Sequence, residues 1–273
     1  MPELPEVETV RRGLDTALGG AVIEHVLLRR KDLRTPFPKG FAAALEGRTI
    51  KNVERRAKYL LFKLDSGTVV IAHLGMSGRF LISFEKPKSF SKHDHLVVRL
   101  ADGRHLIFND ARRFGLMALV KAGQETQHPL FRHLGPEPFS PEFSPAYLKE
   151  KLAKRHGPIK PVLMDQQLVV GVGNIYASEA LFTAGIAPTR SAAKAAAGSK
   201  ALVEAIHKVL KAAIASGGSS LRDFMSVDGE AGYFQHRFQV YGREGKPCRE
   251  CRTPIRIIRQ AGRSTFFCPE CQK

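Results

Sequence analysis

Acidic residues are scarce in this sequence, because 26 Asp and Glu stand against 43 Lys and Arg in a chain of 273 residues. The formal net charge is therefore +17 at pH 7. A surface evolved only for solubility normally carries both signs in near balance. An excess of this size favours polyanionic partners, with nucleic acid first and membrane surfaces second.

Long apolar runs are also missing. No stretch approaches the roughly 20 apolar residues that cross a bilayer. The first ten residues, MPELPEVETV, contain three glutamates, whereas a signal peptide starts with basic residues and continues with an apolar segment. We therefore expect a cytoplasmic protein without a membrane partner.

Cysteine is absent from the first 247 residues, and all four cysteines lie in the last 26. This clustering argues against a disulfide framework across the chain. Two Cys-x2-Cys pairs separated by sixteen residues supply four thiolates for one closed tetrahedral site, which leaves no position for water. We expect one structural Zn²⁺ that stabilises a tail too short to bury its own core. The expected ligands are Cys248, Cys251, Cys268 and Cys271.

Hydropathy patterns in the first half of the chain predict a helix followed by strands. Apolar residues at helical spacing begin after Pro5 and end at Gly19-Gly20. Short β-favouring stretches follow, and Asp65-Ser66-Gly67 and Ala101-Asp102-Gly103 have the composition of turns between strands. Several short strands with regular turns predict a sandwich or a barrel.

Prolines mark the expected boundary between domains. Five prolines interrupt residues 128–145, which excludes a continuous helix or a central strand there. We place an N-terminal catalytic domain at 1–130, a linker at 131–146, a helical domain at 147–240 and a four-cysteine zinc finger at 241–273.

Three helices are expected in the helical domain. One starts at the N-cap Ser144 and runs toward His156. The others cover residues 175–184 and 199–216, and the apolar face of the last one predicts packing in a core.

The start of the chain, Met1-Pro2-Glu3, has the chemistry of a nucleophile. Removal of Met1 would leave Pro2 with a secondary amine, and an α-amino group titrates near pH 7.7–8.0 in reference peptides. A neutral fraction is then available to attack C1′ of a sugar and form an iminium ion. Glu3 can donate a proton to the ring oxygen. Taken alone, most such starts are an acidic lead into a helix, so the catalytic interpretation needs the motifs in the rest of the chain.

Motifs along nearly the entire chain resemble one family, the bacterial formamidopyrimidine-DNA glycosylases that excise 8-oxoguanine. Only the linker and residues 189–199 carry no matching motif. The motifs occur in the family's order: PELPEVETVRRGL, RRAKYLLF, HLGMSG, NDARRFG, VVGVGNIYASEALF, DGEAGYF and the four-cysteine tail.

The resemblance implies a bifunctional glycosylase and AP lyase of base-excision repair. Such an enzyme binds double-stranded DNA that contains an oxidised purine and cleaves the abasic site by β,δ-elimination. The implied protein is a monomer in the bacterial cytoplasm, associated with the nucleoid. The implied α+β fold has an N-terminal helix with a β-sandwich, then a helical domain with a helix–two-turns–helix and a zinc-bound β-hairpin.

The resemblance also assigns roles in the first half of the chain. Pro2 is similar to the Schiff-base nucleophile, and Glu3 is similar to its acid. Lys58 completes the implied catalytic set and matches a lysine that holds a phosphate near the lesion. Three further residues resemble the apolar plug, the hydrogen-bonding arginine and the aromatic wedge that fill the gap left by a flipped nucleotide. They are Met76, Arg112 and Phe114.

In the second half, Asn174 matches the residue of the helix–two-turns–helix that contacts phosphates. Arg263 matches the arginine of the zinc hairpin, and residues 226–234 resemble a loop that closes over the damaged base. Without the family, Asn174 would be read as a helix N-cap.

Two other functions remain open from the residues. An endonuclease VIII-type enzyme for oxidised pyrimidines would share Pro2, Glu3 and Lys58, although Arg112-x-Phe114 favours the purine enzyme. A non-catalytic zinc-ribbon DNA-binding protein would explain the charge and the cysteines but not the PELPEVE start.

One further motif, His93-Asp94-His95, has the alternation that places both histidines on one face of a strand. No third ligand is evident in the sequence, so we expect structural residues here and no metal site.

Overall fold

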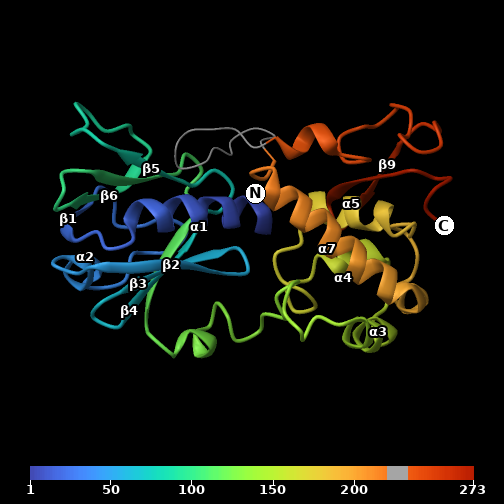
Figure 1. The fold of residues 1–273 in the computed structure, drawn as a ribbon, viewed down its shortest axis with the longest axis horizontal. Helices are drawn as coiled ribbons and strands as arrows, with labels where there is room; N and C mark the ends of the chain where they lie inside the picture. The colour runs from blue at the N-terminus through green and yellow to red at the C-terminus, as the bar shows by residue number, and fades with distance from the viewer. Residues whose placement is uncertain (220–232) are drawn as a thin grey trace. The chain divides into compact units, whose positions relative to one another are not determined.

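The computed structural model describes residues 1–219 and 233–273. The chain forms two compact units (Figure 1). The first contains Met1–Arg132 together with residues 217–219, and the second contains His133–Ser216 and Tyr233–Lys273. In the described ranges, no helix combines the length and the apolar character that a bilayer crossing needs.

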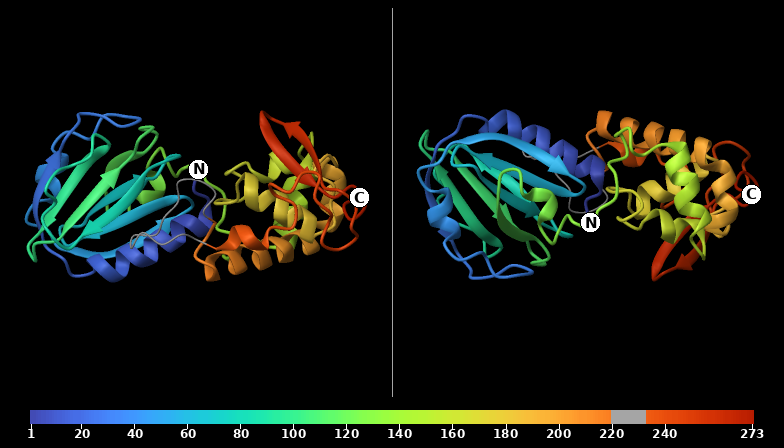
Figure 2. Two further views of the ribbon diagram at one scale, coloured as in Figure 1. Left: turned by 90° about the horizontal axis from the view of Figure 1, so that it is seen from above. Right: turned by 90° about the horizontal axis from the view of Figure 1, so that it is seen from below.

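Helix α1 (Leu4–Leu18) opens the first unit where the sequence predicts a helix. Glu3 is its N-cap residue, and the backbone N–H of Glu3 donates to Oε2 of Glu6 at 2.9 Å. The helix ends at Gly19, and Gly20 follows with a φ of 83° that favours glycine. The buried face of α1 packs against the strands (Figure 2).

The strands form two four-stranded antiparallel sheets in the described part of this unit. The first sheet has the order β1 (Ile23–Leu28), β6 (Asp94–Leu100), β7 (His105–Asn109) and β5 (Arg79–Ser83). The second has the order β2 (Ile50–Arg56), β3 (Tyr59–Leu64), β4 (Thr68–His73) and β8 (Leu116–Lys121). The short helix α2 (Phe41–Leu45) precedes β2, and a 3-10 turn, Glu125–Gln127, follows β8.

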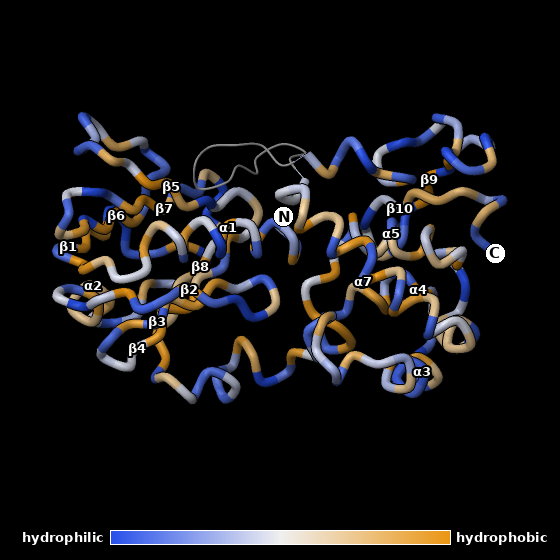
Figure 3. Tube along the Cα trace, in the orientation of Figure 1, coloured by the Kyte–Doolittle hydropathy of each residue, from blue (hydrophilic) through white to orange (hydrophobic). Residues whose placement is uncertain are grey.

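The two sheets share one apolar core. Phe62 of β3 and Phe80 of β5 come from different sheets, and their ring centroids lie 5.4 Å apart. Phe80 in turn lies 5.0 Å from Phe108 of β7. Apolar residues concentrate along these strands, as the hydropathy colouring shows (Figure 3). The sandwich expected from the short strands and their turns is therefore confirmed.

The second unit is helical and carries the β-hairpin. Its helices are α3 (Pro145–Ala153), α4 (Ile159–Leu163), α5 (Asn174–Thr183), α6 (Ala192–Ala195) and α7 (Ser199–Ala215). Two 3-10 turns, Ala196–Gly198 and Phe234–Arg237, flank α7 in sequence. The hairpin consists of β9 (Arg256–Gln260) and β10 (Arg263–Phe267).

The three expected helices of this unit are present with small differences at their ends. Ser144 caps α3, because its Oγ accepts from the backbone N–H of Tyr147 at 3.2 Å. The helix ends at Ala153, before Gly157 adopts a φ of 89° and Pro158 follows. The sequence pattern did not indicate α4, and it left residues 192–197, which contain α6, open as helix or loop. These helices have five and four residues and show too few turns for a periodic signal.

Candidate active site and metal centre

Pro2 immediately precedes Glu3, the N-cap residue of α1, and Glu3 is only 4% exposed. Glu6 fixes this end of the helix, because it is also buried and both of its carboxylate oxygens accept hydrogen bonds. Oε2 accepts from Glu3 N, and Oε1 accepts from the backbone N–H and the Oγ of Ser219 at 2.8 and 2.9 Å. Glu6 was not singled out in the sequence, although its place three residues after the N-cap is a recognised capping position.

Lys58 lies in the two-residue turn between β2 and β3 and is 6% exposed. Ala57 in the same turn has a φ of 54°, a left-handed conformation that is strained for alanine. Arg55 holds the turn, since its Nη1 donates to the carbonyl of Ala57 at 2.9 Å and its Nε donates to Glu8 of α1 at 3.0 Å. The lysine is thereby tied to the helix that carries Pro2 and Glu3.

His73, at the end of β4, is a second residue that the sequence did not single out. Its ring lies 4.8 Å from the ring of Tyr59, and its Nδ1 accepts from the backbone N–H of Gly75 at 3.0 Å. Burial lowers the pKa of His73 to about 4, and the positive charges of Lys58 and Arg34 act in the same direction. A neutral imidazole therefore lies beside the Lys58 ammonium at physiological pH.

The structure brings Met76, Arg112 and Phe114 together on two neighbouring segments. Met76 is 36% exposed and Phe114 is 43% exposed, and Cζ of Arg112 lies 5.0 Å from the centroid of the Phe114 ring. A Cβ at Gly75 would lie 2.4 Å from the backbone carbon of Phe114, so only glycine permits this approach. Two exposed apolar side chains next to a guanidinium have the composition of a plug for a base stack.

Asn174 begins α5 and contacts the zinc hairpin. Its Nδ2 donates to the carbonyl of Ser264 at 3.1 Å and lies 3.3 Å from the hydroxyl of Tyr241. Lys160 is 1% exposed, and its Nζ donates to Oδ1 of Asn174 at 2.5 Å, to the Ser264 carbonyl at 3.0 Å and to Oγ1 of Thr265 at 2.8 Å. This buried ammonium joins the start of α5 to β10, and no pattern in the sequence pointed to it.

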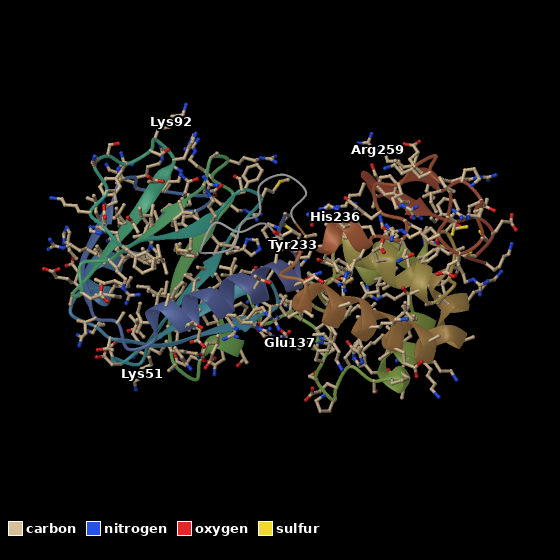
Figure 4. All side chains as sticks on the ribbon, turned by 45° about the horizontal axis from the view of Figure 1, so that its top comes forward. Lys51, Lys92, Glu137, Tyr233, His236 and Arg259 are labelled. Atoms are coloured by element: carbon tan, nitrogen blue, oxygen red, sulfur yellow. The ribbon has the colours of Figure 1, made fainter. Side chains whose placement is uncertain are left out.

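Arg263 is exposed at the start of β10. Other cationic side chains extend outward as well, including Lys51 and Lys92 from the first unit and Arg259 from the second (Figure 4). The large positive charge of the chain is thus available at the surface of each unit.

The four cysteines form a cluster whose Sγ atoms all lie within 4.8 Å of one another. Two of the sulfur pairs are separated by 3.9 Å (Cys248 and Cys271) and 3.4 Å (Cys251 and Cys268). Thiolates of a tetrahedral zinc site with bonds of about 2.3 Å lie about 3.8 Å apart, whereas a disulfide requires about 2.05 Å. The residues therefore fit one structural Zn²⁺ as the spacing predicts.

Glu179 of α5 fastens the chain segment that leads into the cysteine unit. It is 2% exposed, and its carboxylate accepts from three successive backbone N–H groups, those of Gln239 (2.8 Å), Val240 (3.0 Å) and Tyr241 (2.8 Å). Burial raises the pKa of Glu179, and the three donors oppose that rise. Tyr241 is held in this way next to Asn174.

Three family models match successive parts of the chain. The formamidopyrimidine-DNA glycosylase N-terminal domain matches residues 1–117, and the formamidopyrimidine-DNA glycosylase H2TH domain matches residues 134–225. The zinc finger found in FPG and IleRS matches residues 245–273.

Curated relatives match the chain over its full length. The formamidopyrimidine-DNA glycosylase of Azorhizobium caulinodans is 52% identical and that of Roseobacter denitrificans is 50% identical, with 100% of both chains covered in each case.

Solved structures are similar as well. The MutM (Fpg) protein of Thermus thermophilus has a TM-score of 0.88 at 42% identity, covering 99% of this chain and 98% of that one. A variant Fpg of Lactococcus lactis in complex with DNA containing Fapy-dG has a TM-score of 0.92 at 38% identity, with both chains fully covered. The Lactococcus lactis Fpg in complex with DNA containing an abasic site has a TM-score of 0.90 at 37% identity, with 99% of each chain covered.

Proposed function

Since the chain belongs to the formamidopyrimidine-DNA glycosylase family, we propose that its Pro2 is the nucleophile of the reaction. The chain is a bifunctional DNA glycosylase and AP lyase of base-excision repair that removes oxidised purines. The two alternatives, a pyrimidine-directed endonuclease VIII-type enzyme and a non-catalytic zinc ribbon, are set aside.

The assignment of Pro2 rests on its place immediately before the buried Glu3, the N-cap residue of α1. The hydrogen bonds of Glu6 to Glu3 and Ser219 limit the movement of the chain end. This restraint favours attack by the Pro2 nitrogen once Met1 has been removed.

In the proposed reaction the Pro2 nitrogen bonds to C1′ of the damaged nucleotide while the bond from C1′ to the base breaks. The electron pair leaves with the base, which takes up the proton that the Pro2 nitrogen loses as its bond to C1′ forms. Protonation of the sugar ring oxygen by Glu3 opens the ring and leaves an iminium ion at C1′. The iminium acidifies C2′, so that loss of its proton expels the 3′ phosphate and a second elimination expels the 5′ phosphate.

Lys58 is proposed to hold a phosphate next to the lesion. Its turn is tied to α1 through Arg55 and Glu8, so a phosphate bound there would be fixed relative to Pro2. The neutral His73 beside it adds no competing positive charge and has ring nitrogens that can form hydrogen bonds.

Met76, Arg112 and Phe114 are proposed to fill the gap that the flipped nucleotide leaves in the duplex. Met76 and Phe114 offer exposed apolar surface to the base stack. Arg112 carries a planar set of donors that suits the edge of an unpaired cytosine.

The second unit is proposed to bind the phosphate backbone through Asn174 and Arg263. Asn174 belongs to the H2TH match, and Arg263 belongs to the zinc-finger match. We retain the proposed division of the chain into a catalytic domain at 1–130, a linker at 131–146, a helical domain at 147–240 and a zinc finger at 241–273. The proposed base-covering loop, residues 226–234, lies largely outside the described residues.

We further propose that the enzyme acts as a monomer in the bacterial cytoplasm, associated with the nucleoid and without a membrane partner. The net charge of +17 supports binding to long DNA. Light scattering of the free protein and of its complex with a short duplex measures the number of chains per DNA, and a dimer in either state would contradict this proposal.

Borohydride trapping on a duplex with an abasic site tests the role of Pro2. The protein with Met1 removed is expected to form a covalent adduct, and mass spectrometry of the digested adduct is expected to place the DNA on Pro2. The matched control is the same chain with Met1 retained, which blocks the amine and leaves the rest of the fold unchanged. An adduct of equal yield in the control, or an adduct on a lysine, contradicts the proposal.

A further inference from the structure

Asp110 directly follows β7 and is fully buried. Its Oδ1 accepts from the Oγ of Ser77 at 2.6 Å and from the backbone N–H of Arg112 at 3.2 Å. Its Oδ2 accepts from the backbone N–H of Gly115 at 2.8 Å. The Asp110 side chain therefore accepts hydrogen bonds from both ends of the segment that carries Arg112 and Phe114.

The same carboxylate reaches the segment that carries Met76. Ser77 follows Met76, donates its hydroxyl proton to Asp110 and accepts from the backbone N–H of Arg112 at 3.0 Å. The close approach of Gly75 to the backbone of Phe114 adds a second contact between these segments. Asp110 and Ser77 thus connect all three proposed plug residues through hydrogen bonds and backbone packing.

The motif His93-Asp94-His95 forms the base of this arrangement. Nε2 of His95 lies 2.8 Å from the carbonyl oxygen of Asp110, and the backbone N–H of Asp110 donates to the carbonyl of His93 at 3.0 Å. Nδ2 of Asn109 donates to Oδ1 of Asp94 at 2.7 Å. Because a carbonyl only accepts, the proton of His95 lies on Nε2.

This proton assignment leaves Nδ1 of His95 as a buried acceptor that has no partner among the described residues. Such a group costs stability. The Nε2 hydrogen bond on the opposite side of the ring fixes the backbone at Asp110.

We propose that Asp110 is a positioning residue that holds Met76, Arg112 and Phe114 in one preformed arrangement, with His93-Asp94-His95 as its support. The proposal rests on the proposed role of these three residues in filling the stack. Arg113 in the middle of the segment has a φ of 56°, so the segment is strained and relaxes without its hydrogen bonds. A plug that is ordered before DNA binds loses less conformational entropy when it enters the stack.

A tryptophan reporter tests the proposal without DNA. The chain contains no tryptophan, so Phe114→Trp places the single tryptophan of the protein in this segment, and its emission can be excited selectively over that of tyrosine. In this background Asp110→Asn replaces one acceptor oxygen with a donor NH2 group, and Ser77→Ala removes the link between the two segments. Both variants are expected to lower the anisotropy of the tryptophan and to raise its quenching by iodide about twofold.

Asp102→Asn is the matched control, because Asp102 also closes a turn next to β7, where it accepts from the backbone N–H of Arg104 at 3.0 Å. It is expected to leave the fluorescence unchanged. Circular dichroism reports whether each variant folds, and Ser77→Ala decides the matter if Asp110→Asn does not fold. Unchanged anisotropy and quenching in the folded variants overturn the proposal.

Activity assays with Phe114 intact link the position of the segment to function. Asp110→Asn is expected to slow single-turnover excision from 8-oxoguanine·cytosine duplex by about tenfold, the effect of losing a hydrogen bond to a charged group. Cleavage at a preformed abasic site is expected to change less than about twofold, and the preference for cytosine opposite the lesion is expected to weaken. An equal loss of both activities would overturn the positioning role.

The proposed role of the plug and the positioning role of Asp110 can be refuted separately. If Arg112→Ala leaves the cytosine preference intact, the proposed role of the plug fails, whereas the tryptophan measurement still decides whether Asp110 orders the segment. If Arg112→Ala removes the preference and Asp110→Asn changes neither the preference nor the fluorescence, the proposed function stands and the positioning role is wrong.

Discussion

His73 is expected to make the stability of the protein depend on pH. It lies where β4 ends, next to Tyr59 and the Lys58 turn, and burial together with the charges of Lys58 and Arg34 lowers its pKa to about 4. Its ring nitrogen Nδ1 accepts from Gly75 at the start of the Met76 segment. Protonation of this ring would place a third positive charge beside two others in a buried setting.

The direction of this pH dependence follows from the order of the unfolded and folded pKa values of His73. An unfolded histidine titrates near pH 6.5, so the unfolded chain takes up this proton before the folded chain does. The contribution of His73 to stability is therefore fully present above about pH 6.5 and is lost as the pH falls toward about 4. Between pH 7 and pH 5 the loss amounts to roughly 2 kcal/mol.

The measurement is the free energy of unfolding in urea at pH 7 and at pH 5, for the wild type and for His73→Asn. The Asn Oδ1 can replace Nδ1 as the acceptor for Gly75, but the side chain does not titrate. The wild type is expected to lose about 2 kcal/mol more than the variant over this interval. Other titrating groups, including the zinc ligands, are common to both proteins and cancel in the difference.

His156→Asn is the control, because His156 is an exposed histidine of the second unit, and its pH dependence is expected to match the wild type. Equal losses in the wild type and in His73→Asn would refute the reasoning. A direct NMR titration that gives His73 a pKa near 6.5 would do the same.

Three further outcomes are expected. Metal analysis should find one zinc per chain in the wild type, and Cys248→Ser should lose the ion and weaken DNA binding because Arg263 loses its support; full affinity without zinc would contradict this. Lys58→Ala should reduce the slope of the logarithm of affinity for undamaged duplex against the logarithm of salt concentration by about one. Lys51 is exposed, and Lys51→Ala is the control that should leave this slope unchanged. Arg112→Ala should slow excision opposite cytosine about tenfold or more and abolish the preference for cytosine, with little effect at a preformed abasic site; equal losses on both substrates would identify a residue of the fold.

Features that depend on local spacing could be predicted from the sequence. The zinc ligands are among them, because each Cys-x2-Cys pair is a local knuckle and two such pairs define a complete tetrahedral site. Helix α1 and the turns at residues 65–67 and 101–103 followed from periodicity and turn composition. The family, and with it the roles expected of Pro2, Glu3 and Lys58, followed from the order of motifs along the chain.

Other parts of the site depend on pairs of residues that no local pattern connects. Glu6 accepts from Ser219, which is 213 residues away, and Lys160 donates to Thr265, which is 105 residues away. Glu179 accepts from backbone N–H groups about 60 residues later in the chain. Each acid or lysine looked like an ordinary helix residue in the sequence, because hydropathy periodicity reports which face of an element is buried and not what that face meets.

Only tertiary contacts determine how the plug residues are held. The same is true of the neutral state of His73 next to Lys58. Ser77 and Asp110 are 33 residues apart, and they meet only because β5 and β7 are neighbours in one sheet. His73 has an ordinary histidine sequence context, yet packing against Tyr59 and burial near two cations keep it neutral. Burial and the surrounding charges set such a pKa, and they exist only once the two sheets have packed.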